Sequence, residues 1–452
     1  MRLKAIFTIT LFIAASKVSA QDMNWDIETC IDYAIANNIQ IKQGGNTVEI
    51  RRLEREQAKF NYLPSLNANA GYNTSFGRSL DPTTYEFKDQ NINNVNASTS
   101  LNTQIFAGMQ KLHTLRRTEF DLLASMQDVE RIKNEITLAV AAAYLHVLYN
   151  KEQIATSESQ LESLQIQIDN TQKLVKAGSM ALGSQLELEA QYAQEQYNLV
   201  NYQNELSNSL LTLTQLLELR NVPEFDVVIP NLDNFTADGL VSSVDDIYSM
   251  ALGLPQIEVE RFKLLSAEKD VSIAKSRFYP TLGFNANYGS SYSDARTRPM
   301  LDPNGQTYTA SYPFFDQMGD NASTSLSFNL QIPIFNSLTV RRNVKIAHVN
   351  FMNQDLALTL AKDRLYKDIQ QAYTDATGAI NRYRSAESSV HSNQESFRYA
   401  EKKLNAGQSA PVDYTVAKSN LIVAQSAMIQ AKYDYIFKIK ILDFYRGVKI
   451  TL

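Results

Sequence analysis

Residues 109–177 read MQKLHTLRRTEFDLLASMQDVERIKNEITLAVAAAYLHVLYNKEQIATSESQLESLQIQIDNTQKLVKA, a run of 69 residues without one glycine or proline. These residues are the usual helix breakers, so the run predicts a single helix, which at about 1.5 Å per residue would be roughly 100 Å long. Over its second half every seventh position is apolar: Val140, Val147, Ile154, Leu161, Ile168 and Val175. That period is typical of helices that coil around neighbouring helices. The run ends at Ala177-Gly178, a helix-stop signal.

The same pattern occurs again 229 residues later. The second stripe consists of Ile369, Ala376, Tyr383, Val390, Phe397 and Leu404, and the second stop is Ala406-Gly407. After each stop a return helix carries its own seven-residue stripe, at Tyr192, Leu199, Leu206 and Leu213 and then at Leu421, Met428, Tyr435 and Leu442. We therefore predict that the chain is an internal duplication.

Ahead of each long helix the apolar period changes to two, which is the pattern of a strand with two different faces. In the first copy the alternation occupies residues 64–77 and 95–105, and in the second it occupies residues 280–288 and 324–334. One face of each strand is apolar and the other is uncharged and polar. Such strands are long enough to cross a bilayer when tilted, with lipid on one side and water on the other. The alternative is a soluble, half-buried hairpin.

The polar faces supply the residues that we expect to line a pore. They are Asn67, Asn69, Asn73, Ser98, Asn102, Gln104, Asn285, Asn287, Asn329 and Gln331. The offset between the copies grows from 216 at the first strand to 229 at the long helix, so the second outer loop is 13 residues longer than the first. Loops at strand tips accept such differences without disturbing the scaffold.

Four strands cannot close a barrel, and an open sheet edge in hydrocarbon leaves backbone groups unpaired at several kcal/mol each. Three chains would contribute twelve strands, an even number within the range of outer-membrane barrels. The predicted fold is therefore mainly α-helical and duplicated, with four membrane strands per chain in a shared twelve-stranded trimeric β-barrel. A long α-helical, coiled-coil barrel continues it on the periplasmic side.

The expected order of segments follows the two copies. Residues 1–20 are a signal peptide, 21–219 the first repeat, 220–243 an equatorial connector and 244–452 the second repeat. Each repeat begins with a short helix and a second helix. The first then has a β-hairpin, a long helix and a return helix at 63–107, 108–176 and 184–219, and the second has them at 279–335, 336–405 and 411–446.

The first 20 residues have the features of a secretory signal: Arg2 and Lys4, an apolar run, and small residues before Gln21. Its removal takes the net charge from −5 to −8, which argues against nucleic acid as a partner. Cys30 is the only cysteine, so we expect no disulfide framework. Because Gln21 follows the cleavage site, we expect no lipid anchor on an N-terminal cysteine.

No enzyme motif stands out. The sequence has no HExxH, G-x-S-x-G, P-loop or paired-cysteine spacing, and its four histidines, His113, His146, His348 and His391, are scattered. We therefore predict no catalytic residues, no metal site and no cofactor.

Several short motifs, in the same order in both copies, resemble those of the TolC-like outer-membrane efflux proteins over nearly the whole mature chain. They are Ala34-Ile-Ala-Asn-Asn38, Leu63-Pro64-Ser-Leu66, Ile105-Phe106-Ala-Gly108, Ala143-Tyr144-Leu145, Tyr279-Pro280-Thr-Leu282, Pro333-Ile-Phe335, Ala372-Tyr373 and both Ala-Gly turns. The resemblance implies a homotrimeric channel-tunnel in the outer membrane, with its helical part in the periplasm. It would dock with a periplasmic adaptor protein and an inner-membrane pump of the RND or ABC type, and would only conduct what the pump expels.

The resemblance also places a gate at the periplasmic end. In that family, carboxylates a few residues past the second glycine turn line the constriction, and Asp413 falls on the first such position. Val416 replaces the second carboxylate, Ser409 stands where an arginine latch can occur, and Ser184 is the equivalent of Asp413 in the first copy. Asp413 also has a simpler interpretation, as a first-turn acid favoured by the helix dipole. The adaptor is expected to contact the exposed turns, at Ala177, Gly178, Ser179, Ala406, Gly407 and Gln408.

Three alternatives remain open at this point. A periplasmic coiled-coil tether without a pore explains the heptads but not the strands, and a passive porin would need more strands and no long rods. Within the leading interpretation, the chain could serve type I polypeptide secretion rather than small-molecule efflux. The residues do not distinguish drugs, metals and polypeptides as cargo.

Overall fold

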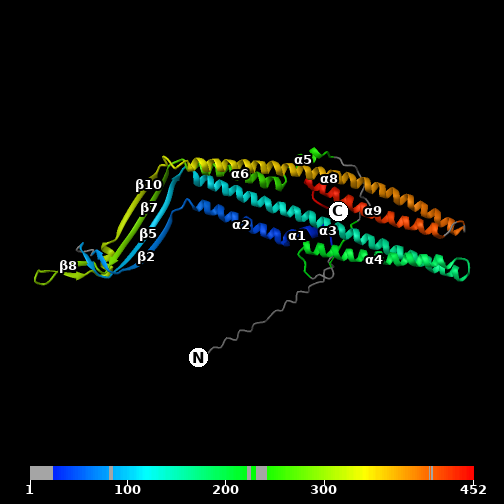
Figure 1. Ribbon diagram of the computed structural model, residues 1–452, viewed down its shortest axis with the longest axis horizontal. Coiled ribbons are helices and arrows are strands. Elements are labelled where there is room, and N and C mark those ends of the chain that lie inside the picture. The colour runs from blue at the N-terminus through cyan, green and yellow to red at the C-terminus, as the bar shows by residue number, and fades with distance from the viewer. Residues whose placement is uncertain are drawn as a thin grey trace, which may run out of the picture. The chain divides into compact units, whose positions relative to one another are not determined.

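The computed structural model describes residues 24–80, 85–220, 225–230, 242–406, 408 and 411–451 (Figure 1). The predicted signal peptide, residues 1–20, lies outside the described residues, as do Gly407, Ser409 and part of the predicted connector. No helix in the described ranges has both the length and the hydropathy needed to span a bilayer.

The helices confirm the duplication. The long helices α3 (Gln110–Lys176) and α8 (Thr339–Asn405) each have 67 residues, and the return helices α4 (Leu182–Leu216) and α9 (Pro411–Tyr445) each have 35. All of their bounds differ by the offset of 229 that the stripes predict. The preceding helices α2 (Ile39–Phe60) and α6 (Pro255–Ser276) differ by 216, and each follows a short helix, α1 (Ile27–Asn37) or α5 (Val244–Ala251).

The strand-to-helix junction sets where α3 begins. Gly108 and Met109 both have positive φ angles, of 58° and 68°. Residues with such angles cannot continue a right-handed helix, so α3 begins at Gln110, two residues after the predicted start. The equivalent residues of the second copy, Ser337 and Leu338, have φ angles of 53° and 60°, and α8 begins after them.

The four long strands form one antiparallel sheet in the order β10-β7-β5-β2. They are β2 (Ser65–Ser75), β5 (Ile92–Ala107), β7 (Thr281–Ser293) and β10 (Ser323–Gln331). The first hairpin thus pairs with the second through β5 and β7, with Asn102 opposite Asn285 and Leu101 opposite Ala286. Alternation alone does not predict this order, because it says which face a residue takes but not which strand lies beside it.

A β-bulge interrupts the predicted alternation of β5. Gln104 lies opposite Gly283, but the next pair is Phe106 with Leu282, so Ile105 has no cross-strand partner. Phe106, and not Ile105, is therefore the residue of β5 paired with Leu282 of the apolar face. A bulge adds one residue to a strand and reverses the faces beyond it.

Shorter elements extend from this framework. The outer loop of the first copy contains β3 (Arg78–Leu80) and β4 (Phe87–Asp89), and that of the second contains β8 (Thr297–Leu301), β9 (Thr307–Ser311) and α7 (Phe314–Asp320). Within the predicted connector, β6 (Asp226–Val227) pairs in parallel with β1 (Asn24–Trp25).

The chain divides into two compact units, and each takes part of both repeats. The first unit holds the residues up to Gln43, Glu130–Leu254 and the residues from Asp363 on. Side-chain hydrogen bonds there join α4 to α3, α3 to α9 and α9 to α8, through Asn150 to Ser209 at 2.6 Å, Gln153 to the Ser426 carbonyl at 3.2 Å and Arg382 to Asp434 at 2.6 Å. The helices therefore pack largely through polar and small side chains.

The second unit holds Gly44–Val129 and Pro255–Lys362, which include the sheet and the helix ends next to it. Here polar contacts join α2 to α3, α3 to α6 and α6 to α8. They are Arg55 to Glu119 at 3.5 Å, Ser266 to Asp121 at 2.5 Å and Gln354 to Glu260 at 2.7 Å.

Candidate functional site

The register of the sheet brings all ten predicted pore-lining residues to one face. Directly opposed residues of neighbouring strands share a face, and the pairs run Asn67 with Ser100, Ser100 with Asn287, and Asn287 with Ser325. Asn69, Asn73, Ser98, Asn102, Gln104, Asn285, Asn329 and Gln331 follow the same alternation. Asn285 donates a hydrogen bond from its amide to the Asn102 side chain. The resulting face is polar and without charge.

The opposite face of the sheet is apolar and exposed in the single chain. Leu66, Tyr72 and Phe328 each expose about two thirds of their surface. The remaining large apolar residues on this face include Leu101, Leu282, Phe284, Tyr288, Leu326 and Leu330. A contiguous apolar surface of this size needs an apolar environment or a partner to cover it.

Both edges of the sheet are open in the single chain. Within the described residues, β2 is hydrogen-bonded only to β5 and β10 only to β7. The outer side of each edge strand therefore presents backbone donors and acceptors that another strand can pair with.

The two gate candidates on α9 lie on its exposed side. Asp413 lies in the first turn of α9 and is exposed, as is Val416 one turn further on. Tyr414 and Thr415, between them, are buried. Ser184 lies in the first turn of α4, where it lines a cavity of about 700 Å³ together with Leu404, Tyr414 and Thr415. Ser409 is outside the described residues, and the gate stays a prediction.

Lys418 was not anticipated from the sequence. Only 4% of this side chain is exposed, and its Nζ donates a hydrogen bond to the Ser163 Oγ of α3 at 2.8 Å. Burial lowers the pKa of Lys418 to about 8, against the opposing effect of the Glu401 carboxylate. Its spacing in the sequence could have indicated its burial. Lys418 follows Tyr414 by four residues and therefore lies on the same, buried face of α9.

The first Ala-Gly turn has the geometry that its sequence predicts. Gly178 has a φ angle of 72°, and a side chain added there would meet open space. The Ser179 amide donates to the Leu174 carbonyl at 2.9 Å and the Gly178 amide to the Val175 carbonyl at 3.0 Å, which closes the helix end. Ala177, Gly178 and Ser179 are exposed.

The second turn is described only in part, since Gly407 lies outside the described residues. Ala406 donates to the Lys402 carbonyl at 3.0 Å, and Gln408 to the Lys403 carbonyl at 2.9 Å. Ala406 and Gln408 are exposed. The first turn thus presents backbone and small side chains to the surroundings, and Ala406 and Gln408 are the described residues of the second.

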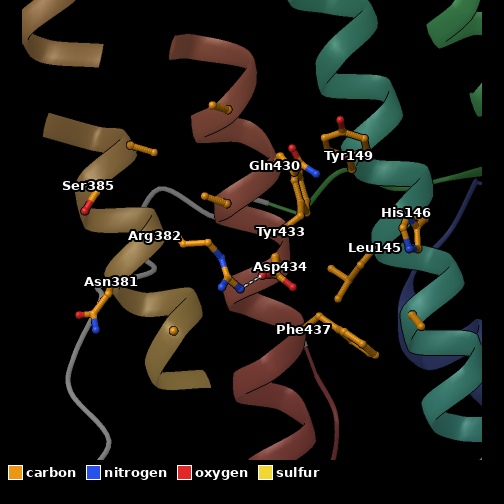
Figure 2. A pocket seen from close by; sticks show the side chains of 15 residues that line it. Leu145, His146, Tyr149, Asn381, Arg382, Ser385, Gln430, Tyr433, Asp434 and Phe437 are labelled. Atoms are coloured by element: carbon orange, nitrogen blue, oxygen red, sulfur yellow. Dashed lines mark hydrogen bonds and ion pairs between the residues drawn. The ribbon is translucent and has the colours of Figure 1, made fainter. Parts of the chain in front are cut away.

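A recess of about 810 Å³ lies between α3, α8 and α9 (Figure 2). In Figure 2, Arg382 reaches from α8 to Asp434 of α9, and the pair is 2.6 Å apart. Gly378 makes room for this contact, because a Cβ there would lie 3.3 Å from Arg382 Nη1. Alanines keep the rest of the recess wide: Ala142, Ala386, Ala427 and Ala431.

The recess lies on a different side of α3 from the β1–β6 pair. Tyr144 of α3 donates to the carbonyl oxygens of Trp25 at 3.2 Å and Val228 at 2.7 Å. At 3.6 residues per turn, His146 and Tyr149 point away from Tyr144, and both line the recess.

The family description "Outer membrane efflux protein" matches residues 30–218 and 247–438, which is most of the chain. The chain belongs to the outer membrane efflux protein family. The two matched segments are the two copies of the duplication. This confirms the resemblance that the short motifs indicate, and it places the protein in a family of channels rather than of enzymes.

Relatives of this outer membrane efflux protein include outer membrane protein TolC of Escherichia coli, 25% identical over 96% of this chain and 84% of the relative. The alkaline protease secretion protein AprF of Pseudomonas aeruginosa is 22% identical over 92% of this chain and 83% of its own. Among solved structures, the outer membrane protein VceC of Vibrio cholerae has a TM-score of 0.75 at 15% identity, covering 93% of this chain and 96% of that one.

These matches confirm the predicted fold class, a mainly helical chain with long rods and a small set of membrane strands. They also confirm the predicted location in the outer membrane and the general function. The protein is an outer-membrane efflux channel.

Proposed function

We propose that three copies of this chain share one twelve-stranded barrel, continued by a tube of the long helices, and conduct substances that an inner-membrane pump expels. The observation that carries the proposal is the sheet, with an uncharged polar face, an apolar face and two open edges. Pairing β2 of one copy with β10 of the next satisfies both edges at once. The resemblance to the TolC-like family, which implies a homotrimer, supports the same arrangement.

In this assembly the polar face lines the pore and the apolar face meets lipid. Asparagine and serine amides and hydroxyls bind many solutes weakly and none strongly, so the wall suits a general conduit. The energy for transport would come from the inner-membrane partner, an RND or ABC transporter, through a periplasmic adaptor. Small-molecule efflux and type I polypeptide secretion both fit this wall, and the relatives include a toxin and drug export protein as well as AprF.

The adaptor would contact the two Ala-Gly turns, Ala177 to Ser179 and Ala406 to Gln408. This contact is supported by the first turn, whose residues are small and exposed. Backbone hydrogen bonds close that turn, and a Cβ added at Gly178 would have no neighbouring atom within 4 Å. A partner can therefore approach the backbone closely there.

Substitution of Ser179 by arginine tests the channel and the adaptor contact together. We expect purified Ser179→Arg trimers to conduct in planar bilayers like the wild type, while export in cells is lost because the long side chain blocks docking. Asn304→Arg, in the exposed turn between β8 and β9, is the matched control, and we expect it to retain both conduction in bilayers and export in cells. If wild-type trimers carried no current in planar bilayers, the proposed channel would be wrong. If cells with Ser179→Arg exported normally, the proposed adaptor contact would be wrong.

Asp413 is proposed to line the periplasmic constriction. Three exposed carboxylates converging on one axis attract cations, most strongly at low ionic strength. Asp413→Asn should therefore reduce the preference for cations over anions, measured as the reversal potential of single channels in a salt gradient. Ser184→Asn serves as the control from the first copy. An unchanged reversal potential would leave Asp413 as a helix-capping acid only.

A further inference from the structure

The loop that joins β7 to β10 is folded against the end of β7. Gln317 of α7 is fully buried; its side-chain oxygen accepts from the Ser293 amide at 2.6 Å, and its side-chain nitrogen donates to the Ser293 carbonyl at 3.1 Å. Asn321 donates to the Ser291 carbonyl at 2.5 Å. Strand β10 begins at Ser323, opposite Gly289, and does not reach the last residues of β7. The side-chain amides of Gln317 and Asn321 form hydrogen bonds with the β7 backbone there instead.

Two residues on the apolar face of the sheet also contact α7. Ser290 and Tyr292 belong to that face, since they lie opposite Ala97 and Val95. The Ser290 hydroxyl donates to the Met318 carbonyl at 2.6 Å, and the ring of Tyr292 lies 4.9 Å from that of Phe314.

A series of aromatic rings leads outward from this contact. Phe314 packs edge-on against Phe315, with ring centroids 5.2 Å apart, and Phe315 is 84% exposed. The rings therefore extend the apolar face of the sheet beyond the end of its strands.

The β8–β9 hairpin adds to the same surface. Arg298 forms an ion pair with Asp316 of α7 at 3.2 Å, so the side of the hairpin that carries Arg298 faces α7. Met300 and Tyr308 are opposite one another on that side, two residues nearer the turn, and are exposed. The acidic residues of α7 are engaged within the loop, Asp316 by Arg298 and Asp320 by the Tyr312 hydroxyl. The rings, and not the carboxylates, are left facing outward.

We propose that this loop, residues 294–322, binds the outer leaflet of the membrane, with Phe315, Met300 and Tyr308 at the boundary between lipid headgroups and acyl chains. Large exposed apolar patches on an ordered loop mark an interaction surface. Lipid is the occupant because the patch continues the apolar face that meets lipid in the proposed assembly. Aromatic residues are enriched at that depth of a bilayer, where one side of the ring is apolar and the other wet. This inference rests on the proposed placement of the sheet.

Fluorescence of single tryptophans tests the inference. Trp25 is the only tryptophan, so Trp25→Phe provides a dark background. In that background Phe315→Trp is reconstituted as trimers into phosphatidylcholine vesicles that carry bromine, a quencher, either near the headgroup end or near the middle of the acyl chains. We expect strong quenching by the shallow bromine and weaker quenching by the deep one.

Two further variants make the result specific. Phe328→Trp, on the apolar face of β10, should be quenched if the sheet meets lipid, and Tyr399→Trp, exposed on α8, should not be. Quenching of Phe328→Trp without quenching of Phe315→Trp overturns the inference and leaves the proposed function intact. Loss of quenching in both overturns the proposed function. If Phe315→Trp escapes both brominated lipid and aqueous iodide, sister loops cover it and the lipid assignment is wrong.

Discussion

Replacing Gly108 by alanine is expected to lower the free energy of unfolding by about 2–4 kcal/mol and to reduce the yield of assembled trimers. Gly108 has a φ angle of 58°, and a Cβ there would lie 2.4 Å from the Ser276 carbonyl oxygen and 2.7 Å from the Tyr279 Cβ. Both obstacles belong to the end of α6 and the residues just after it, so neither can move aside easily. The measurement is thermal or denaturant unfolding of the purified protein in detergent.

The second copy supplies the matched control. Ser337 is the equivalent of Gly108 and has a φ angle of 53°, yet it carries a side chain. Ser337→Gly should change stability by less than about 1 kcal/mol, because relief of left-handed strain offsets the greater freedom of glycine in the unfolded chain. If Ser337→Gly instead raised the stability by as much as Gly108→Ala lowers it, the backbone angle alone, and not the contact with Ser276, would set the requirement for glycine.

The long elements could be predicted from the sequence because their signals are local. A run without glycine or proline specifies the first rod, α3, and the offset of 229 specifies the bounds of its copy, α8, which contains Gly378. The two faces of the sheet are equally local, since they follow from alternation. The pairing of β5 with β7 is not local, because it joins residues such as Asn102 and Asn285 that alternation treats as unrelated. The bulge at Ile105 is invisible for the same reason.

The residues of the candidate site also differ in whether a local sequence signal indicates them. Asp413 was found because it follows a recognisable turn, and its exposed position on α9 agrees with the gate without testing it. Lys418 was missed because a lysine on a helix is ordinarily at the surface. Its partner Ser163 is 255 residues away, and only the packing of α9 on α3 brings the two together.

That buried lysine gives a prediction whose sign changes with pH. Lys418 has a pKa of about 8 in the folded protein, below its ordinary value of 10.5, because burial disfavours the charged form. Between these two values the unfolded chain binds more protons than the folded one, so this group makes the protein more stable as pH rises from about 8 to 10.5. Below pH 8 the penalty for burying the charge is present in full.

Lys418→Met should therefore be more stable than the wild type at pH 7, by about 1–2 kcal/mol, since it removes the buried charge but also the hydrogen bond to Ser163. Near pH 10.5 only the lost hydrogen bond remains, and the variant should be equal to the wild type or slightly less stable. Melting temperatures of both proteins at the two pH values measure the effect. Lys403→Met, which removes an exposed lysine near the end of α8, should show no such crossing. A variant that is less stable at both pH values would mean that the Lys418 charge stabilises the packing of α9 on α3 despite its burial.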